Sequence, residues 1–277
     1  MTTDELIIRA LEEDLGDGDH TTLATLTGKK TGRAKLLVKE EGIICGTDIA
    51  EKVFHRIDPS LQISSFISDG TRVRKGDIVF TVTGNKASIL SSERLVLNFM
   101  QRLSGIATVT ARIVKKLEGL QTRVLDTRKT TPLLRTLEKY AVVTGGGGNH
   151  RMGLYDMILI KDNHVDFAGG IGPAIDAVHQ YLDRTGKKLK VEIEVRNLDE
   201  LKRVLEHGKV DRIMLDNFTP GLLKEAVALI DRKYETEASG GITEINIREY
   251  AETGVDFISI GALTTQVRNL DLSLKAM

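Results

Sequence analysis

The sequence has 277 residues, with 39 Lys and Arg against 39 Asp and Glu, so its formal net charge at neutral pH is zero. This balance argues against binding to nucleic acid or to an anionic membrane surface. Hydrophobic residues make up 41% and charged residues 28%, which is typical of a globular protein and excludes a disordered or fibrous chain.

The single cysteine, Cys45, excludes an internal disulfide and a cysteine-based metal site. The first residues are acidic, where a secretory signal would carry a basic start followed by an apolar run. Charged residues interrupt the apolar stretches well before the ~18 residues that a membrane helix needs. We therefore expect a cytoplasmic protein that does not span a membrane.

The first part of the chain combines helical and strand-like patterns. Thr2 and Glu5 match a capping box, and apolar residues at helical spacing predict a helix over residues 2–15. Short strand-like runs separated by glycines over residues 32–84 predict a small open sheet with one or two helices. A long amphipathic helix is predicted over residues 92–117, and its length suits a connector between two domains.

Beyond residue 120, short apolar strands alternate with helices. The predicted strands are 123–125, 157–160, 191–195, 212–215, 234–237 and 257–260. The predicted helices are 132–140, 173–183, 198–207, 220–230 and 243–253. This alternation indicates a parallel sheet. Polar residues at the ends of several strands favour a barrel over a doubly wound sheet, because barrels collect their active sites there.

Two cations follow the predicted strand 123–125. Arg128 and Lys129 lie just before Pro132, which is placed as the first residue of a helix with Thr131 as its cap. A guanidinium, an ammonium and free backbone N–H groups would then converge on one anion. The alternative is a solvated loop with two exposed bases.

Four consecutive glycines at 145–148 precede Asn149, His150 and Arg151. Glycines are tolerated where backbone approaches a ligand, although a flexible linker is the alternative. Lys161 ends the predicted strand 157–160, as a partner for a carboxylate or phosphate or as a Schiff-base nucleophile. Residues 121–164 contain seven Lys or Arg against four Asp or Glu. This local excess of positive charge favours a small polyanionic substrate.

Carboxylates follow on the next strands. Residues 191–195 alternate, so that Glu192 and Glu194 are predicted to face the barrel interior, and Asp216 ends the next strand. Structural pairing with interior cations is one interpretation, and binding of ribose hydroxyls, directly or through Mg²⁺, is the other. The glycine-containing loops at 239–242 and 260–262 suit a terminal phosphate.

Motifs along nearly the whole chain resemble the quinolinate phosphoribosyltransferase family. They include residues 13–16, 19–22, 103–108, 126–132, 146–151, 159–164, 215–218 and 239–242. The resemblance implies an α/β protein: an open-faced α/β sandwich, at residues 1–110, and an irregular parallel α/β barrel, at residues 111–277. The C-terminal segment is a candidate to pack back on the first domain. A homodimer with shared active sites is also implied, with a hexamer as a further option.

The family converts quinolinate and 5-phosphoribosyl pyrophosphate to nicotinate mononucleotide, pyrophosphate and carbon dioxide, with Mg²⁺, in NAD synthesis. By resemblance, quinolinate is bound by Arg128, His150, Arg151 and Lys161, and by Arg94 from the neighbouring subunit. Lys129 is assigned to the pyrophosphate or carboxylate side, and Glu194 and Asp216 to the ribose and the metal. The 5-phosphate is assigned to Ser239, Gly240 and Gly261. The catalytic set implied is Lys129, Lys161, Glu194 and Asp216.

One position departs from the family pattern, and three different functions remain open. Many family members carry a phosphate-binding histidine where this chain has Thr265, which adds no charge. A Schiff-base aldolase that uses Lys161 would also fit a barrel with a phosphate loop. The sequence is also compatible with the molybdenum-associated paralogue of the family and with a non-catalytic sugar-phosphate sensor.

Overall fold

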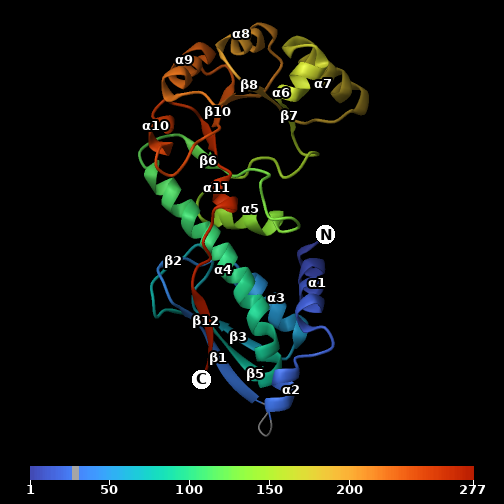
Figure 1. Ribbon diagram of the computed structural model, residues 1–277, viewed down its shortest axis with the longest axis vertical. Helices are drawn as coiled ribbons and strands as arrows, with labels where there is room; N and C mark the ends of the chain where they lie inside the picture. The colour runs from blue at the N-terminus through green and yellow to red at the C-terminus, as the bar shows by residue number, and fades with distance from the viewer. Residues whose placement is uncertain (27–30) are drawn as a thin grey trace. The chain divides into compact units, whose positions relative to one another are not determined.

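The computed structural model describes residues 1–26 and 31–277, which form two compact units (Figure 1). The first unit comprises residues 1–111, 131–146 and 263–277, and the second comprises residues 112–130 and 147–262. Both units are therefore discontinuous in sequence. The linear division near residue 110 stays a prediction.

The first unit is built on an antiparallel sheet with the strand order β12-β1-β5-β3. A short second sheet pairs β2 with β4. The elements that lie in this unit, or begin or end in it, are α1 (Thr3–Leu15), α2 (His20–Thr25), β1 (Thr31–Val38), β2 (Gly42–Ile43), α3 (Thr47–Ile57), β3 (Gln62–Ser65), β4 (Arg72–Val73), β5 (Ile78–Asn85), α4 (Lys86–Lys116), α5 (Arg135–Thr144), α11 (Ala262–Thr265) and β12 (Leu272–Ala276).

Local sequence explains several of these elements. The predicted capping box is confirmed: Thr2 N–H donates to Glu5 Oε2 at 2.7 Å, and Glu5 N–H donates to Thr2 Oγ1 at 3.2 Å. Alternate residues of β1 are buried, as expected for a strand with one covered face. Phe54 of α3 meets Phe80 of β5 edge to face, with ring centroids 5.9 Å apart. The core of the unit lies between this sheet and its helices.

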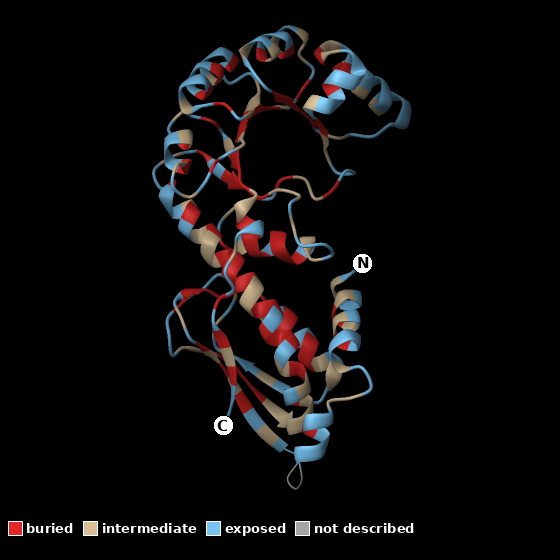
Figure 2. Cartoon of the chain, viewed as in Figure 1, coloured by how far each residue is buried: buried red, intermediate tan, exposed pale blue. Residues whose placement is uncertain are grey.

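The second unit is a six-stranded parallel sheet with the order β6-β11-β10-β9-β8-β7. Figure 1 shows that the sheet curves and that helices α6 to α9 cover its outer side. Its elements are β6 (Arg123–Leu125), β7 (Ile158–Ile160), α6 (Asp162–Ala168), α7 (Ile171–Thr185), β8 (Val191–Val195), α8 (Leu198–His207), β9 (Arg212–Asp216), α9 (Pro220–Ile230), β10 (Glu235–Ser239), α10 (Ile247–Ala251) and β11 (Phe257–Ser259). The predicted α/β class is confirmed, and the strands are largely buried (Figure 2).

The edge strand β6 receives a further backbone partner. Gly148 forms an isolated parallel bridge with Leu125. Gly148 N–H donates to Val124 O at 2.8 Å, and Asp126 N–H donates to Gly148 O at 3.0 Å. The end of the glycine run therefore lies along the open edge of the parallel sheet, which leads directly into His150 and Arg151.

The predicted helix over residues 132–140 was wrong at its start. The helix α5 begins at Arg135, and Leu133 in the preceding turn has a φ of +67°. Thr131 caps no helix, because its N–H and hydroxyl donate to Glu138 at 3.0 and 2.8 Å. Glu138 is fully buried and pairs with Arg102 at 2.8 Å. Tertiary contacts thus override the local threonine–proline pattern, and no helix N-terminus directly follows Arg128 and Lys129.

Among the other predicted helices, two differ most from the structure. The helix α4 begins six residues before the predicted start at Ser92, directly after β5. The helix α10 covers only Ile247–Ala251, because Thr243 N–H bonds to Asn246 Oδ1 in a preceding turn. Among the residues described, none of the helices combines the length and the apolar character that crossing a membrane requires.

Candidate active site

Polar side chains gather at the carboxyl end of the parallel sheet, where α/β barrels bind ligands. Every residue predicted for the site, apart from Arg94, belongs to the second unit. Most of them lie at or after strand ends: Arg128 and Lys129 after β6, Lys161 after β7, Glu194 in β8, Asp216 in β9, Ser239 and Gly240 at the end of β10, and Gly261 after β11. His150 and Arg151 follow Gly148, which forms an isolated bridge with Leu125 of β6.

Arg128 and Arg151 are neighbouring cations, and both are half-buried. The Arg151 guanidinium donates to the backbone oxygen of Met157 at 3.2 Å. Burial lowers the pKa of Arg151, and the positive charge of Arg128 lowers it further. An anion bound beside both guanidinium groups would relieve this repulsion, so the pair suits a ligand with carboxylates.

Lys161 and Glu194 form an ion pair at the ends of two adjacent strands. The Nζ atom of Lys161 lies 3.4 Å from Oε2 of Glu194, and their side chains are 47% and 9% exposed. Burial raises the pKa of Glu194, Lys161 lowers it, and Asp216 raises it. The carboxylates of Glu194 and Asp216 are therefore close enough to repel each other, which suits a cation or hydroxyl groups between them.

The loops after β9 and β10 hold Asp216 in place. Its Oδ1 accepts from the Ser239 hydroxyl at 2.6 Å, and its Oδ2 accepts from the Asn217 amide at 2.6 Å. Asn217 has a φ of +58°, and its N–H donates to the backbone oxygen of Ser239 at 2.9 Å. A Cβ atom on Gly240, which has a φ of +87°, would overlap the Asn217 side chain. Position 240 therefore requires glycine.

Replacing Gly240 by alanine is expected to destabilise the protein by about 1–3 kcal/mol, because it combines an unfavourable φ with the overlap on Asn217. Urea unfolding measures the loss. Gly221→Ala is the matched control, since Gly221 lies in α9 and a Cβ there meets open space. Equal stability of the two variants would contradict the prediction.

Lys129 lies beside the loop that follows the neighbouring strand. The strand β6 pairs with β11, which brings Lys129 next to Gly261. A Cβ atom on Gly261 would lie 3.0 Å from Cδ of Lys129 and 3.9 Å from its Nζ. An ammonium beside a glycine backbone is an arrangement that suits a phosphate group.

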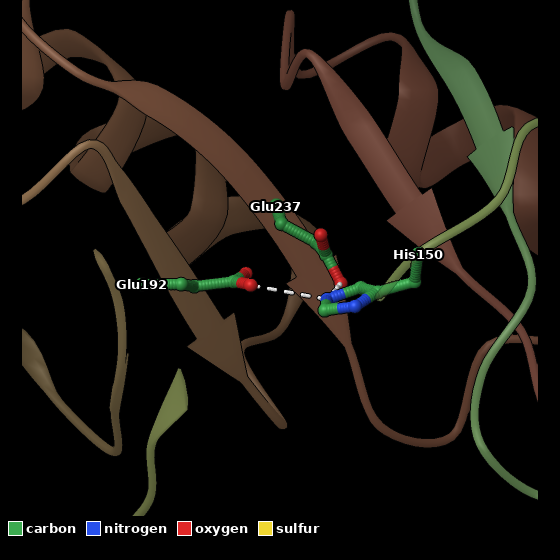
Figure 3. A group of neighbouring side chains, drawn as sticks. All are labelled: His150, Glu192 and Glu237. Atoms are coloured by element: carbon green, nitrogen blue, oxygen red, sulfur yellow. Dashed lines mark ion pairs between the residues drawn. The ribbon is translucent and has the colours of Figure 1, made fainter. Parts of the chain in front are cut away.

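The His150 side chain turns into the sheet interior and is only 6% exposed. Its Nε2 atom lies 3.0 Å from Glu192 Oε2 and 3.4 Å from Glu237 Oε1, and both glutamates are fully buried (Figure 3). Burial lowers the pKa of His150, but the two carboxylates raise it to about 9. Burial also raises the pKa of Glu192.

One proton in this cluster is shared between its members. The backbone N–H of Arg151 donates to Nδ1 of His150 at 2.7 Å, which favours a ring with its proton on Nε2. The raised pKa of His150 favours a second proton on the ring instead. The pKa of Glu192 is raised as well, so we assign the second proton to the His150–Glu192 pair rather than to one residue.

The stability of the protein is expected to fall as the pH rises from 7 through about 9, the pKa to which the glutamates raise His150. The folded cluster keeps a proton that an unfolded histidine loses near pH ~6.5, so the stabilisation is complete below that pH and is lost progressively as the pH rises to about 9. Urea unfolding between pH 6 and 9.5 measures the fall. His150→Asn should give a flatter curve, and identical curves would contradict the assignment.

Sequence reasoning missed three residues of this region, and one residue that it predicted lies outside the second unit. Asn217, Arg212 and Glu237 were not predicted as site residues. The left-handed conformation that asparagine tolerates was a signal for Asn217, but the pairing of Glu237 with His150 depends on the fold. Arg94 is exposed on α4 of the first unit, so it is not among the residues that the second unit brings together.

Comparisons with known proteins agree over almost the full length. Residues 19–104 match the family described as "Quinolinate phosphoribosyl transferase, N-terminal domain", and residues 106–275 match the corresponding C-terminal domain. The chain is 45% identical over 286 residues to "Quinolinate phosphoribosyltransferase [decarboxylating] 2, mitochondrial" of Nicotiana glauca, covering 98% of this chain and 81% of that protein.

A bacterial relative and a solved structure extend the comparison. The "Probable nicotinate-nucleotide pyrophosphorylase [carboxylating]" of Bacillus subtilis is 41% identical over 262 residues, covering 95% of this chain and 89% of that protein. The structure of the nicotinate-nucleotide pyrophosphorylase from Francisella tularensis is similar with a TM-score of 0.94 and 41% identity, and covers 99% of this chain and 96% of that chain.

Proposed function

The chain belongs to the quinolinate phosphoribosyl transferase family, and we propose that it transfers the phosphoribosyl group of 5-phosphoribosyl pyrophosphate to quinolinate with decarboxylation. The products are nicotinate mononucleotide, pyrophosphate and carbon dioxide, in NAD biosynthesis. The observation that carries this proposal is the set of cations and carboxylates on the strand ends of one parallel sheet. It matches the charges of a dicarboxylate and a sugar pyrophosphate.

Quinolinate binding is assigned to Arg128, Arg151 and Lys161, and His150 is assigned a supporting role in this binding. The repulsion between the two arginines supports this assignment, because two substrate carboxylates would replace it with charge-assisted hydrogen bonds. Arg94 is proposed to complete the site from the partner protomer of a homodimer. Assembly of dimers into hexamers is a further prediction.

Glu194 and Asp216 are the proposed ligands for the ribose hydroxyls and Mg²⁺. Their residue types fit this metal, since Mg²⁺ prefers oxygen ligands and usually binds together with substrate phosphates. The raised pKa of Glu194, to which Asp216 contributes, also fits, because a dication would reduce the repulsion. When bound, Mg²⁺ supplies positive charge that offsets the charge of the pyrophosphate leaving group.

The 5-phosphate is assigned to Ser239, Gly240 and Gly261, and the pyrophosphate or carboxylate side to Lys129. The proximity of Lys129 to Gly261 supports this part of the site. Glu194 and Asp216 are positioned to stabilise positive charge that develops on the sugar as pyrophosphate departs. The catalytic set is thus Lys129, Lys161, Glu194 and Asp216. Thr265, at the position of the family histidine, is not included.

Decarboxylation is proposed to follow sugar transfer. Once the ring nitrogen carries the ribosyl group, its positive charge stabilises the electron pair that the departing carboxylate leaves on the adjacent ring carbon, and a proton then takes the place of the carboxylate. Carbon dioxide release from quinolinate should therefore require 5-phosphoribosyl pyrophosphate, and nicotinate, which lacks the second carboxylate, should release none. Release from quinolinate alone would overturn the order, and no product with both substrates would overturn the function.

The alternative functions receive less support. The Lys161 ammonium pairs with Glu194, which suits anion binding better than the neutral amine of a Schiff-base aldolase. Borohydride trapping with a carbonyl substrate tests that alternative directly. Pyrophosphate release from the mixed substrates would dispose of a sugar-phosphate sensor. The cytoplasmic location stays a prediction, since the name of the Nicotiana glauca relative assigns that protein to mitochondria.

A further inference from the structure

A buried charged cluster links three strands of the parallel sheet to the segment that carries Arg151. Glu192 of β8 and Glu237 of β10 are fully buried, and Figure 3 shows both carboxylates directed at the His150 ring. Arg212 of β9 contacts the same cluster, with Nη1 2.9 Å from Glu237 Oε2. None of the roles proposed above uses either glutamate.

Two buried carboxylates are costly, so their presence needs a compensating role. Moving a charged group from water into the interior costs several kcal/mol, and the attraction of a partner offsets this only when the geometry is good. Arg212 and the proton shared by His150 and Glu192 supply the compensating charge. A divalent metal ion would fit the same ligand types, but the Arg212 guanidinium already pairs with the Glu237 carboxylate.

The position of His150 explains which part of the chain the cluster fixes. The residues before it lie on the open edge of β6 through the Gly148 hydrogen bonds, and the His150 N–H donates to the buried Asp126 carboxylate at 2.9 Å. The ring then spans the interior to β8 and β10. Arg151 comes next in the chain, so a fixed His150 also fixes the position from which the Arg151 side chain leaves the backbone.

We propose that Glu192 and Glu237 are positioning residues for dicarboxylate binding: by holding the His150 ring, they place Arg151 beside Arg128. The proposal rests on the function proposed above. It assigns the glutamates no contact with substrate. Their loss should therefore weaken quinolinate binding through Arg151, and leave binding of the sugar pyrophosphate nearly unchanged.

The test compares Glu192→Gln and Glu237→Gln with Glu235→Gln in the full-length protein. Glu235 is the matched control, because it lies on β10 and pairs with Arg212 at 3.0 Å but is 40% exposed and has no ion pair with His150 among the described contacts. We expect KM for quinolinate to rise about tenfold in the first two variants. KM for 5-phosphoribosyl pyrophosphate should stay within about twofold, and Glu235→Gln should change neither.

Several outcomes would overturn the proposal. Equal changes in both KM values, or lower thermal stability without any change in their ratio, would assign the glutamates a structural role only. A stoichiometric metal ion in the purified wild type that is absent from Glu192→Gln would identify a metal site instead. If the Gln variants do not fold, Glu237→Asp keeps the charge but withdraws it from the ring, and should raise only KM for quinolinate. An inactive wild type would refute the proposed function first.

Discussion

A mixture of Arg94→Ala and Lys161→Ala protomers is expected to recover roughly a quarter of wild-type activity, although each variant alone is nearly inactive. In a homodimer with shared sites, a mixed dimer has one site with both lesions and one site with neither. Random pairing makes about half of the dimers mixed, and each of these has one intact site of two. Product formation after co-expression of the two variants measures the recovery.

The control for this experiment is a mixture of Lys161→Ala with Arg128→Ala. Both residues belong to the second unit, so every mixed dimer keeps one lesion in each site and no activity should return. Recovery with Arg94→Ala but not with Arg128→Ala would establish that Arg94 acts across the dimer. Failure of both mixtures, with mixed dimers present, would refute the shared site.

Replacing Arg151 by alanine is expected to lower kcat/KM for quinolinate roughly a thousandfold, or about 4 kcal/mol of transition-state stabilisation. The side chain is half-buried beside Arg128, where a charged hydrogen bond to a carboxylate is stronger than at an exposed site. Steady-state kinetics with varied quinolinate measures the loss.

Two further variants serve as comparisons for this result. Arg151→Lys keeps the charge but not the planar guanidinium, and should lose only about tenfold. Arg184→Ala removes an exposed arginine from the last turn of α7 and should change nothing. A loss of less than about tenfold in Arg151→Ala would argue against quinolinate binding at this residue.

The predicted strands agree with the structure more closely than the predicted helix starts. Strands 123–125 and 191–195 match β6 and β8 at both ends, because a short apolar run and a strict apolar–polar alternation are strong local signals for a strand. Helix α5 instead begins after a turn that Glu138 holds through contacts with Thr131. Such a contact depends on the side chains that surround Glu138 and leaves no mark in the local pattern.

Some residues of the candidate site could likewise be predicted from local sequence, and others could not. The rule that parallel strands end at one edge is sufficient to group Lys161, Glu194 and Asp216, because each lies at or next to the last residue of a strand. The orientation of His150 is different, since its partners come from β8 and β10, far away in sequence. Arg94 was suggested only by family resemblance, because a helix-surface arginine has no distinguishing local pattern.

The pairing of β12 with β1 has a consequence for how the protein is made. Val38 is paired in register with Leu272, and the Lys39 N–H donates to the Asp271 backbone oxygen at 2.9 Å, so this edge of the first sheet is completed only by residues translated after the second unit. While the ribosome produces the second unit, β1 presents an uncovered edge to other nascent chains, which favours aggregation. Chaperone dependence during translation should therefore be concentrated in the interval before residue 272 emerges.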